Sequence, residues 1–225
     1  MVVARGRVSG RMNGRTMRKK EDEKTSGFYQ LVTKPAFYGR FQQFMGAETA
    51  KNRFVKEWLV PNESSDILDV GCGTANIVKY LSYRSYLGID HNNAHISHAR
   101  AENYKHASFV VGVLPANASL IEGVFDRIIC TGFLHHLSDD KAIDLLATLK
   151  PKLAEGGFVA IREPVFLEKQ RLVARWMKKL DSGQHIRTIH GYRSLFAQDK
   201  FRIEDKISHD LSRLPYDHYW ARLYA

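Results

Sequence analysis

The sequence predicts an α/β protein built on a mostly parallel β-sheet with helices on both faces. Five short apolar runs recur between residues 67 and 161, and segments with helical periodicity separate them. Strands that are apolar throughout are buried on both faces, which is typical of parallel sheets. Two runs of alternating character close the chain, and antiparallel edge strands are common on such sheets.

The segments before the first strand are polar and then helical. Residues 1–26 are polar and punctuated by glycine, which predicts a disordered basic leader. The next residues, to about Val60, predict an N-terminal helical extension, because Phe37, Phe41 and Phe44 recur at spacings of three and four. A proline and polar residues then break this pattern.

The remaining elements follow from the same periodicity. The predicted strands are residues 67–70, 86–90, 108–111, 125–130, 158–161, 201–209 and 216–224. Helices are expected from Gly73 to about Tyr80, from Asp90 to about Tyr104, from Ser138 to Gly156, and around residues 172–176. In the third of these, Ser138 can cap the first turn.

Basic residues give the chain a formal net charge of +10, and they are unevenly placed. Residues 1–24 carry eight Lys/Arg against three acids and residues 168–225 carry twelve against seven, whereas residues 25–167 carry fourteen of each. A basic surface across the whole domain would indicate nucleic acid. Because the central part is neutral, we expect a small-molecule partner and no nucleic acid.

The sequence also bounds the compartment. No apolar run approaches the ~18 residues of a membrane span, and the N-terminus lacks the apolar block of a secretory signal. Cys72 and Cys130 lie in apolar stretches, so we expect packing residues without a disulfide, which is compatible with the cytoplasm. An organelle-targeting segment before Glu21, or a later start at Met12 or Met17, are the alternatives for the leader.

The candidate binding site lies where the first two strands end, because ligands of open α/β sheets bind beyond the carboxyl ends of strands. The first strand runs into residues 69–73, Asp-Val-Gly-Cys-Gly, whose glycines let a ligand approach the backbone before an expected helix N-terminus. Asp90 ends the second strand, where a carboxylate can accept both hydroxyls of a ribose. These features indicate a cofactor that contains a nucleoside.

Other ligand classes fit less well. No Gly-Lys-Ser/Thr follows a glycine loop, so a P-loop is excluded, and Asn76 stands where a dinucleotide site needs a small residue. Asp69, two residues before the first glycine, favours a ligand with an amino-acid end. Three histidines share a helix face at residues 91, 95 and 98, but without an adjacent carboxylate or cysteine we predict no metal.

Four segments carry a family resemblance. They are residues 67–74 (ILDVGCGT), 87–90 (LGID), 125–137 (FDRIICTGFLHHL) and the turn from 149–151 to 156–157. In this order they resemble the motifs of the class I S-adenosylmethionine-dependent methyltransferases, over about residues 30–225. The resemblance implies a Rossmann-like, seven-stranded, mostly parallel sheet with an antiparallel last strand, and S-adenosyl-L-methionine as cofactor, with S-adenosyl-L-homocysteine as product.

The resemblance also implies a domain plan and site residues. A single methyltransferase domain would cover 27–225, with N-terminal helices at 27–62, a cofactor-binding core at 63–165, and a substrate-capping segment with closing strands at 166–225. The resemblance implies eleven cofactor residues, which would line the methionine part, the ribose, the adenine and the sulfonium. They are Tyr38, Asp69, Gly71, Cys72, Gly73, Asp90, His91, Val113, Leu114, Thr131 and Gly132. The chain departs from the family at residues 112–114, which lack a frequent acid, and at Ala75, where a glycine is frequent.

Catalytic and acceptor residues are predicted further along the chain. A general base after the fourth strand would be His135 or His136, with His135 facing the pocket, against the alternative of a structural role. The predicted acceptor residues are His185, Arg187, Tyr192, Arg213, Tyr216 and His218. Arginine matches carboxylate geometry, which favours an anionic or polyoxygenated acceptor; structural salt bridges are the alternative.

The leading hypothesis is therefore a small-molecule methyltransferase directed at oxygen. RNA methylation is an alternative, opposed by the neutral centre and by the absence of an Asn-Pro-Pro-Tyr or Asp-Pro-Pro-Tyr motif after the fourth strand. A cofactor-binding module without turnover is a further alternative. The acceptor and the oligomeric state stay open at this level.

Overall fold

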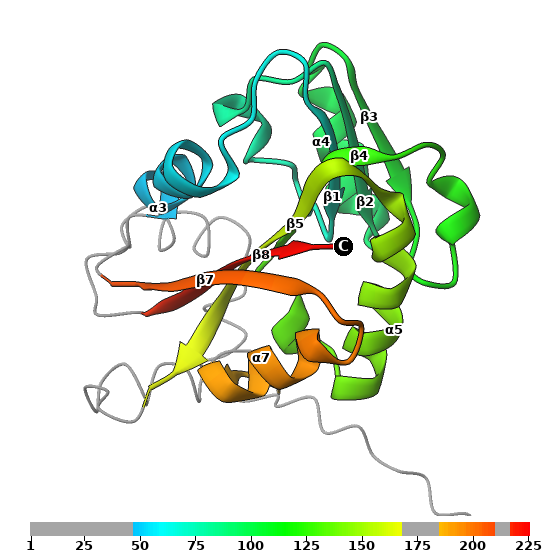
Figure 1. The fold of residues 1–225 in the computed structure, drawn as a ribbon. Coiled ribbons are helices and arrows are strands. Elements are labelled where there is room, and N and C mark those ends of the chain that lie inside the picture. The colour runs from blue at the N-terminus through cyan, green and yellow to red at the C-terminus, as the bar shows by residue number, and fades with distance from the viewer. Residues whose placement is uncertain (1–46, 168–184, 210–216) are drawn as a thin grey trace, which may run out of the picture. The chain divides into compact units, whose positions relative to one another are not determined.

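The computed structural model describes residues 47–167, 185–209 and 217–225 (Figure 1). Its strands are β1 (Asp66–Val70), β2 (Ser85–Asp90), β3 (Ala107–Val111), β4 (Phe125–Thr131), β5 (Leu153–Phe166), β6 (Arg187–Thr188), β7 (Arg202–Ser208) and β8 (His218–Tyr224). They form one sheet in the order β3-β2-β1-β4-β5-β8-β7, with β6 paired to β5. Strand β8 is antiparallel to both β5 and β7, and the neighbours among β1 to β5 pair in parallel. The predicted mostly parallel sheet with an antiparallel last strand is confirmed.

Helices cover both faces of this sheet, as predicted. They are α3 (Ala47–Phe54), which continues as a π-helix (Val55–Leu59), α4 (Asn93–Ala101), α5 (Asp139–Leu149) and α7 (Ile189–Ala197). Single 3-10 turns lie at Val78–Tyr80, Ala118–Leu120, Leu134–His136 and Lys150–Lys152.

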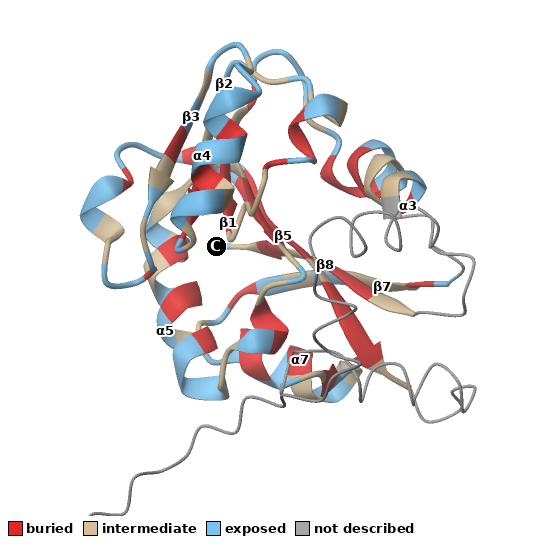
Figure 2. Ribbon diagram, turned by 180° about the vertical axis from the view of Figure 1, so that it is seen from behind, coloured by how far each residue is buried: buried red, intermediate tan, exposed pale blue. Residues whose placement is uncertain are grey.

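The apolar core has one layer on each face. Successive strand residues point to opposite faces, so Leu68 packs in the layer that contains α5 and α7, whereas Ile67 packs in the layer that contains α3 and α4. Figure 2 shows buried residues concentrated along the strands and the sheet-facing sides of the helices. Two rigid layers on a parallel sheet fix the carboxyl ends of the strands as a common edge.

The prediction of a helix between the first two strands is wrong. Turns and the short 3-10 segment at Val78–Tyr80 occupy its place. Gly71, Gly73 and Ala75 have φ angles of 72°, 55° and 56°, and residues in the left-handed region interrupt a right-handed helix. The glycine turn therefore presents no α-helix N-terminus to a ligand.

Helix α5 confirms the prediction of a helix after Ser138, with differences at both ends. Ser138 occupies the N-cap position, but its side chain makes no capping hydrogen bond. The helix ends at Leu149 rather than near the Gly156-Gly157 pair, and strand β5 already begins at Leu153.

Several expectations fall outside the described residues: the basic leader, the helix around residues 172–176, and the site candidates Tyr38, Arg213 and Tyr216. Within the described part of the chain, no helix has the length and apolar character that crossing a membrane requires.

Candidate active site

The two predicted cofactor motifs meet at the carboxyl edge of the sheet. The backbone N–H groups of Gly71 and Cys72 donate to the carbonyl oxygen of Ile89, at 2.8 and 3.1 Å. The Oδ2 atom of Asp90 accepts the N–H of Gly73 at 2.9 Å, and Oδ1 accepts the N–H of Asn92 at 2.8 Å. A carboxylate offers about four lone-pair sites, so this arrangement leaves acceptor capacity for two further hydroxyls.

Asp69 is a buried carboxylate on β1, one pleat below the glycine turn. The Tyr86 hydroxyl donates to its Oδ2 atom at 2.6 Å. Burial raises the pKa of Asp69 to about 7; the hydrogen bond from Tyr86 opposes this shift, and the charge of Asp90 adds to it. Among the described residues no positive charge offsets the ionised form, and the ammonium of an amino-acid ligand would supply one.

The motif glycines have different reasons to be glycine. A Cβ atom on Gly73 or Gly132 would meet nothing within 4 Å, so the backbone there is open to a ligand. A Cβ atom on Gly71 would lie 2.5 Å from Cδ2 of Phe133, a half-buried residue just after β4. Gly71 thus makes room for a ring of the protein itself, a contact that the sequence did not indicate.

The predicted adenine end carries exposed apolar surface. Val113 is 54% exposed and lies after β3, close to Val111, which is 40% exposed, whereas Leu114 is buried. His91 is exposed beside Asp90, its Nδ1 atom 3.6 Å from Oδ1. An exposed aliphatic patch next to the predicted ribose-binding carboxylate of Asp90 suits a flat heteroaromatic ring.

The cysteines have the packing character that the sequence predicted. Cys130 is buried, and Cys72 is half-buried with Sγ against Gly88, and both thiols are free of disulfides. Burial raises the pKa of both thiols, so neither is poised as a thiolate nucleophile.

The residues after β4 contain a buried acid–imidazole pair. Nδ1 of His135 lies 2.5 Å from Oε2 of Glu163 on β5, and these residues are 5% and 0% exposed. Oε1 of Glu163 also accepts the N–H groups of Phe133 and Leu134, at 2.8 and 2.9 Å. Sequence reasoning missed Glu163; an acid that follows the apolar run 158–161 and precedes Pro164 and Val165 was the signal that could have found it.

The two adjacent histidines differ in environment. Their rings are tilted by 38° with centroids 4.1 Å apart, but His136 is exposed and His135 is enclosed beside Glu163. The sequence placed His135 at the pocket, and this role stays a prediction. Its buried carboxylate partner distinguishes it from His136 as the better-held imidazole.

Two predicted acceptor residues are instead engaged inside the protein. Arg187 donates to Asp139 Oδ1 and to the carbonyl oxygens of Leu134, His185 and Leu137, at 2.7 to 3.1 Å. Tyr192 is fully buried, its hydroxyl donating to the Pro164 carbonyl at 3.1 Å.

The consequence is a correction of the predicted roles. The Arg187 guanidinium ties the turn after β4 to β6, and the Tyr192 ring lies parallel to Tyr219 in the core, with centroids 5.2 Å apart. The geometry therefore gives both residues a supporting role instead of an acceptor contact. His185 remains exposed next to the same turn, with its N–H on the His135 carbonyl at 2.9 Å.

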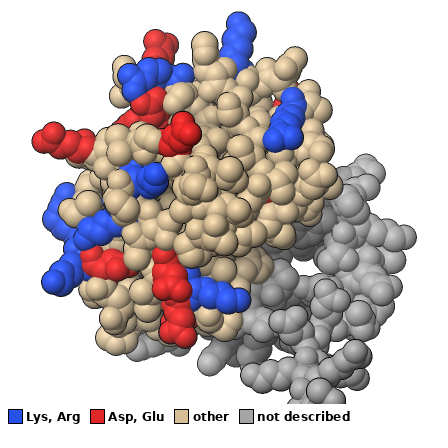
Figure 3. All heavy atoms as spheres, turned by 90° about the vertical axis from the view of Figure 1, so that its right-hand side faces the viewer, with Lys and Arg blue, Asp and Glu red and all other residues tan. Residues whose placement is uncertain are grey.

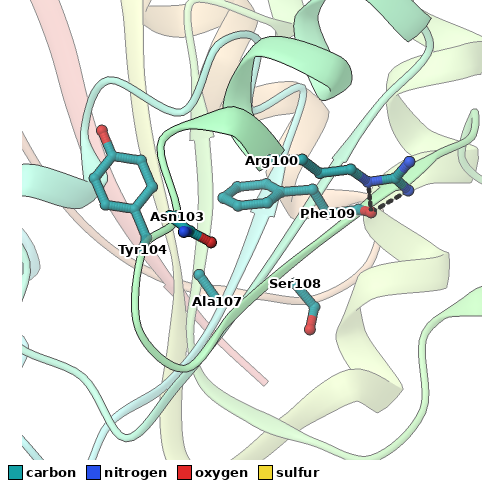
Figure 4. A pocket seen from close by; sticks show the side chains of 6 residues that line it. All are labelled: Arg100, Asn103, Tyr104, Ala107, Ser108 and Phe109. Carbon is teal, nitrogen blue, oxygen red and sulfur yellow. Dashed lines mark hydrogen bonds between the residues drawn. The ribbon is translucent and has the colours of Figure 1, made fainter.

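A hollow of about 320 Å³ lies away from this edge (Figure 4). It is lined by the end of α4 and the first residues of β3: Arg100, Asn103, Tyr104, Ala107, Ser108 and Phe109. Arg100 donates from Nε and Nη2 to the Phe109 carbonyl, at 3.1 and 2.7 Å, which covers the open edge of the sheet. The hollow has no group of the candidate site in its lining.

Two observations describe the grouping of possible metal ligands and of charged side chains in the described part of the chain. No three His, Cys, Asp or Glu side chains in it are grouped in a way that could hold a metal ion. On the face shown in Figure 3, basic and acidic side chains of the described residues are interspersed, without a basic patch.

Comparisons with known proteins agree with this geometry. The family described as "Methyltransferase domain" matches residues 67–157. Trans-aconitate 2-methyltransferase of Deinococcus radiodurans is 27% identical over 129 residues, which cover 56% of this chain and 48% of the relative.

Solved structures share the fold. Mitomycin 7-O-methyltransferase has a TM-score of 0.66 at 13% identity. The alignment covers 89% of this chain and 61% of the mitomycin enzyme. A methyltransferase of calicheamicin biosynthesis, in its S-adenosylhomocysteine-bound form, has a TM-score of 0.64 at 13% identity. The alignment covers 84% of this chain and 57% of the calicheamicin enzyme. The chain thus spans about half to three-fifths of the length of these three proteins. The sheet order and the matched domain make the chain similar to the class I S-adenosylmethionine-dependent methyltransferases.

Proposed function

We propose that the protein transfers a methyl group from S-adenosylmethionine to an oxygen of a small anionic or polyoxygenated molecule. The observation that carries the proposal is the buried His135–Glu163 pair, directly after β4, at the same edge as the glycine turn and Asp90. The name of the relative, trans-aconitate 2-methyltransferase, is consistent with an acceptor rich in oxygen.

The residues at this edge fit the cofactor. Asp90 has acceptor capacity for the ribose hydroxyls. The ammonium of the cofactor would stabilise the ionised form of buried Asp69. The open backbone at Gly73 and Gly132 allows close contact with the cofactor. Val113 and Leu114 would border the adenine. When bound, the cofactor supplies a methyl group on a positively charged sulfur, and positioning both reactants contributes up to about 7–11 kcal/mol.

His135 would act as the general base for a hydroxyl acceptor. Because Nδ1 faces Glu163, a proton taken from the acceptor would go to Nε2, and Glu163 would stabilise the imidazolium that forms. General-base catalysis of this kind typically contributes 10²–10⁴-fold in rate.

Calorimetric titration with S-adenosylhomocysteine tests the proposal. The protein is expected to bind it, and Asp90→Ala is expected to weaken binding about 10- to 100-fold, because hydrogen bonds to a charged group are lost. Asp144→Ala, an exposed acid on α5, is the matched control and should leave the affinity unchanged. Absence of binding, or equal affinity in the Asp90 variant, would contradict the cofactor assignment.

Methyl transfer separates an enzyme from a binding module. We expect radiolabelled methyl groups from S-adenosylmethionine to appear in at least one member of a panel of hydroxyl- and carboxyl-bearing metabolites. Tight cofactor binding without transfer to any of them would favour the module instead.

A further inference from the structure

Arg162 lies beside the end of β4. Its Cα pairs with that of Thr131 across the parallel β4/β5 ladder, and its carbonyl oxygen accepts the N–H of Gly132 at 2.8 Å. Both partners belong to the segment that we place next to the transferred methyl group. Arg162 is therefore at the level of the sheet where the acceptor must approach.

The side chain of Arg162 projects from the face opposite to that of Glu163. Alternate residues of a strand point to opposite faces, and Phe158 and Ala160 of β5 pack in the layer of α3 and the π-helix. Arg162 continues this row past the apolar core. Asp69 on β1 shares the same face, because its register partner Ile129 packs in that layer.

One further basic side chain lies against Arg162. Its Nη2 atom lies 3.4 Å from Nε2 of His218 on β8. A guanidinium can only donate, so the imidazole nitrogen accepts in this contact.

We propose that Arg162, oriented by His218, binds a carboxylate of the methyl acceptor. The planar guanidinium matches the two oxygens of a carboxylate, and its charge does not change with pH. The inference rests on the proposed function, which it narrows from anionic or polyoxygenated molecules to carboxylic acids. The cofactor's own carboxylate is expected near the glycine turn after β1, which is two strands, roughly 10 Å, from β5.

The test compares acids with matched uncharged acceptors. A panel of hydroxyl-bearing mono-, di- and tricarboxylic acids, each paired with its amide, is assayed for transfer of the radiolabelled methyl group. The wild-type protein is expected to prefer an acid over its amide by about 100-fold in kcat/KM. Arg162→Gln should raise KM for that acid about 10- to 100-fold and abolish the preference, with the dissociation constant for S-adenosylhomocysteine unchanged within about twofold.

Two variants serve as references. Arg162→Lys keeps the charge but loses the planar guanidinium, so its KM should lie between those of the wild type and Arg162→Gln. This variant also keeps the inference testable if Arg162→Gln folds poorly. Arg84→Gln is the matched control: Arg84 is an exposed arginine paired with Asp66, next to the amino ends of the strands. It should leave KM unchanged.

The outcomes that overturn the inference are distinct from failure of the proposed function. If the wild type transfers methyl groups only to uncharged acceptors, or if Arg162→Gln leaves KM for acids unchanged, the carboxylate role of Arg162 is wrong. If Arg162→Gln weakens S-adenosylhomocysteine binding in parallel with KM, Arg162 serves the cofactor instead. If the wild type binds no S-adenosylhomocysteine, the proposed function and this inference both fall.

Discussion

Nδ1 of His135 lies 2.5 Å from Oε2 of Glu163, and both side chains are buried. The same carboxylate accepts backbone N–H groups of the turn that follows β4. Glu163 therefore fixes both the backbone of this turn and the imidazole that the turn presents. A single acid in the middle of the sheet thereby sets the geometry of the proposed base.

The first prediction concerns this pair. His135→Asn should lower kcat by 10²–10⁴-fold for a hydroxyl acceptor, because the group that takes the proton is lost. Affinity for S-adenosylhomocysteine should stay within about twofold, and His98→Asn, an exposed histidine on α4, should leave kcat unchanged. Single-turnover methyl transfer measures the effect. A large loss in His136→Asn with normal kcat in His135→Asn would assign the base to the other histidine.

A second prediction follows from the contact between Gly71 and Phe133. Gly71→Ala should destabilise the fold by about 2–4 kcal/mol, since the new methyl group overlaps the ring and φ is positive. Gly123→Ala is the matched control: φ is 78°, but nothing lies within 4 Å of the added Cβ. It should cost only the backbone strain, about 1–2 kcal/mol. Urea denaturation of both variants checks the difference, and equal losses would mean that Phe133 moves aside at no cost.

Asp69 predicts a pH dependence of stability. Its pKa is about 7 in the folded protein against an ordinary value of 3.8, so folding favours the protonated form. This contribution is fully present below about pH 4 and is lost as the pH rises to about 7, amounting to at most about 4 kcal/mol. Asp69→Asn has no carboxyl group that titrates in this range, so its stability does not include this pH-dependent loss.

Unfolding of both proteins in urea between pH 4 and pH 8 measures this effect. The stability of Asp69→Asn relative to the wild type should rise through that window and then level off. Saturating S-adenosylhomocysteine should reduce the wild-type loss, because an ammonium near Asp69 would favour the carboxylate. Parallel stability curves for the two proteins would show that Asp69 stays ionised.

Arg187 gives the last prediction. Arg187→Lys should cost about 2–3 kcal/mol of folding free energy, because an ammonium cannot replace hydrogen bonds to Asp139 and three carbonyl groups. Arg193→Lys, at an exposed ion pair with Asp205, should change stability by less than about 1 kcal/mol. Thermal unfolding compares the two. An Arg187 variant of normal stability with a raised acceptor KM would restore the predicted acceptor contact.

The sequence by itself determined the sheet and the cofactor motifs. Apolar runs and one-sided helices gave the positions of β1 to β5, β7 and β8, because burial on both faces imposes apolar strands. Asp69, Gly71, Gly73 and Asp90 stood out for the same local reason: each lies at the carboxyl end of a predicted strand or in the turn just after it.

Only the tertiary structure decided which side chains support one another. Glu163 is 28 residues from His135 in the chain, and Arg162 meets Thr131 and His218 through strand pairings that no local pattern encodes. The same holds for Arg187 and Tyr192, which looked like ligand contacts and are held by backbone carbonyls. Local periodicity in a sequence indicates burial and the type of element. Hydrogen-bond partners depend on how distant elements pack, so they are determined only when the sheet is assembled.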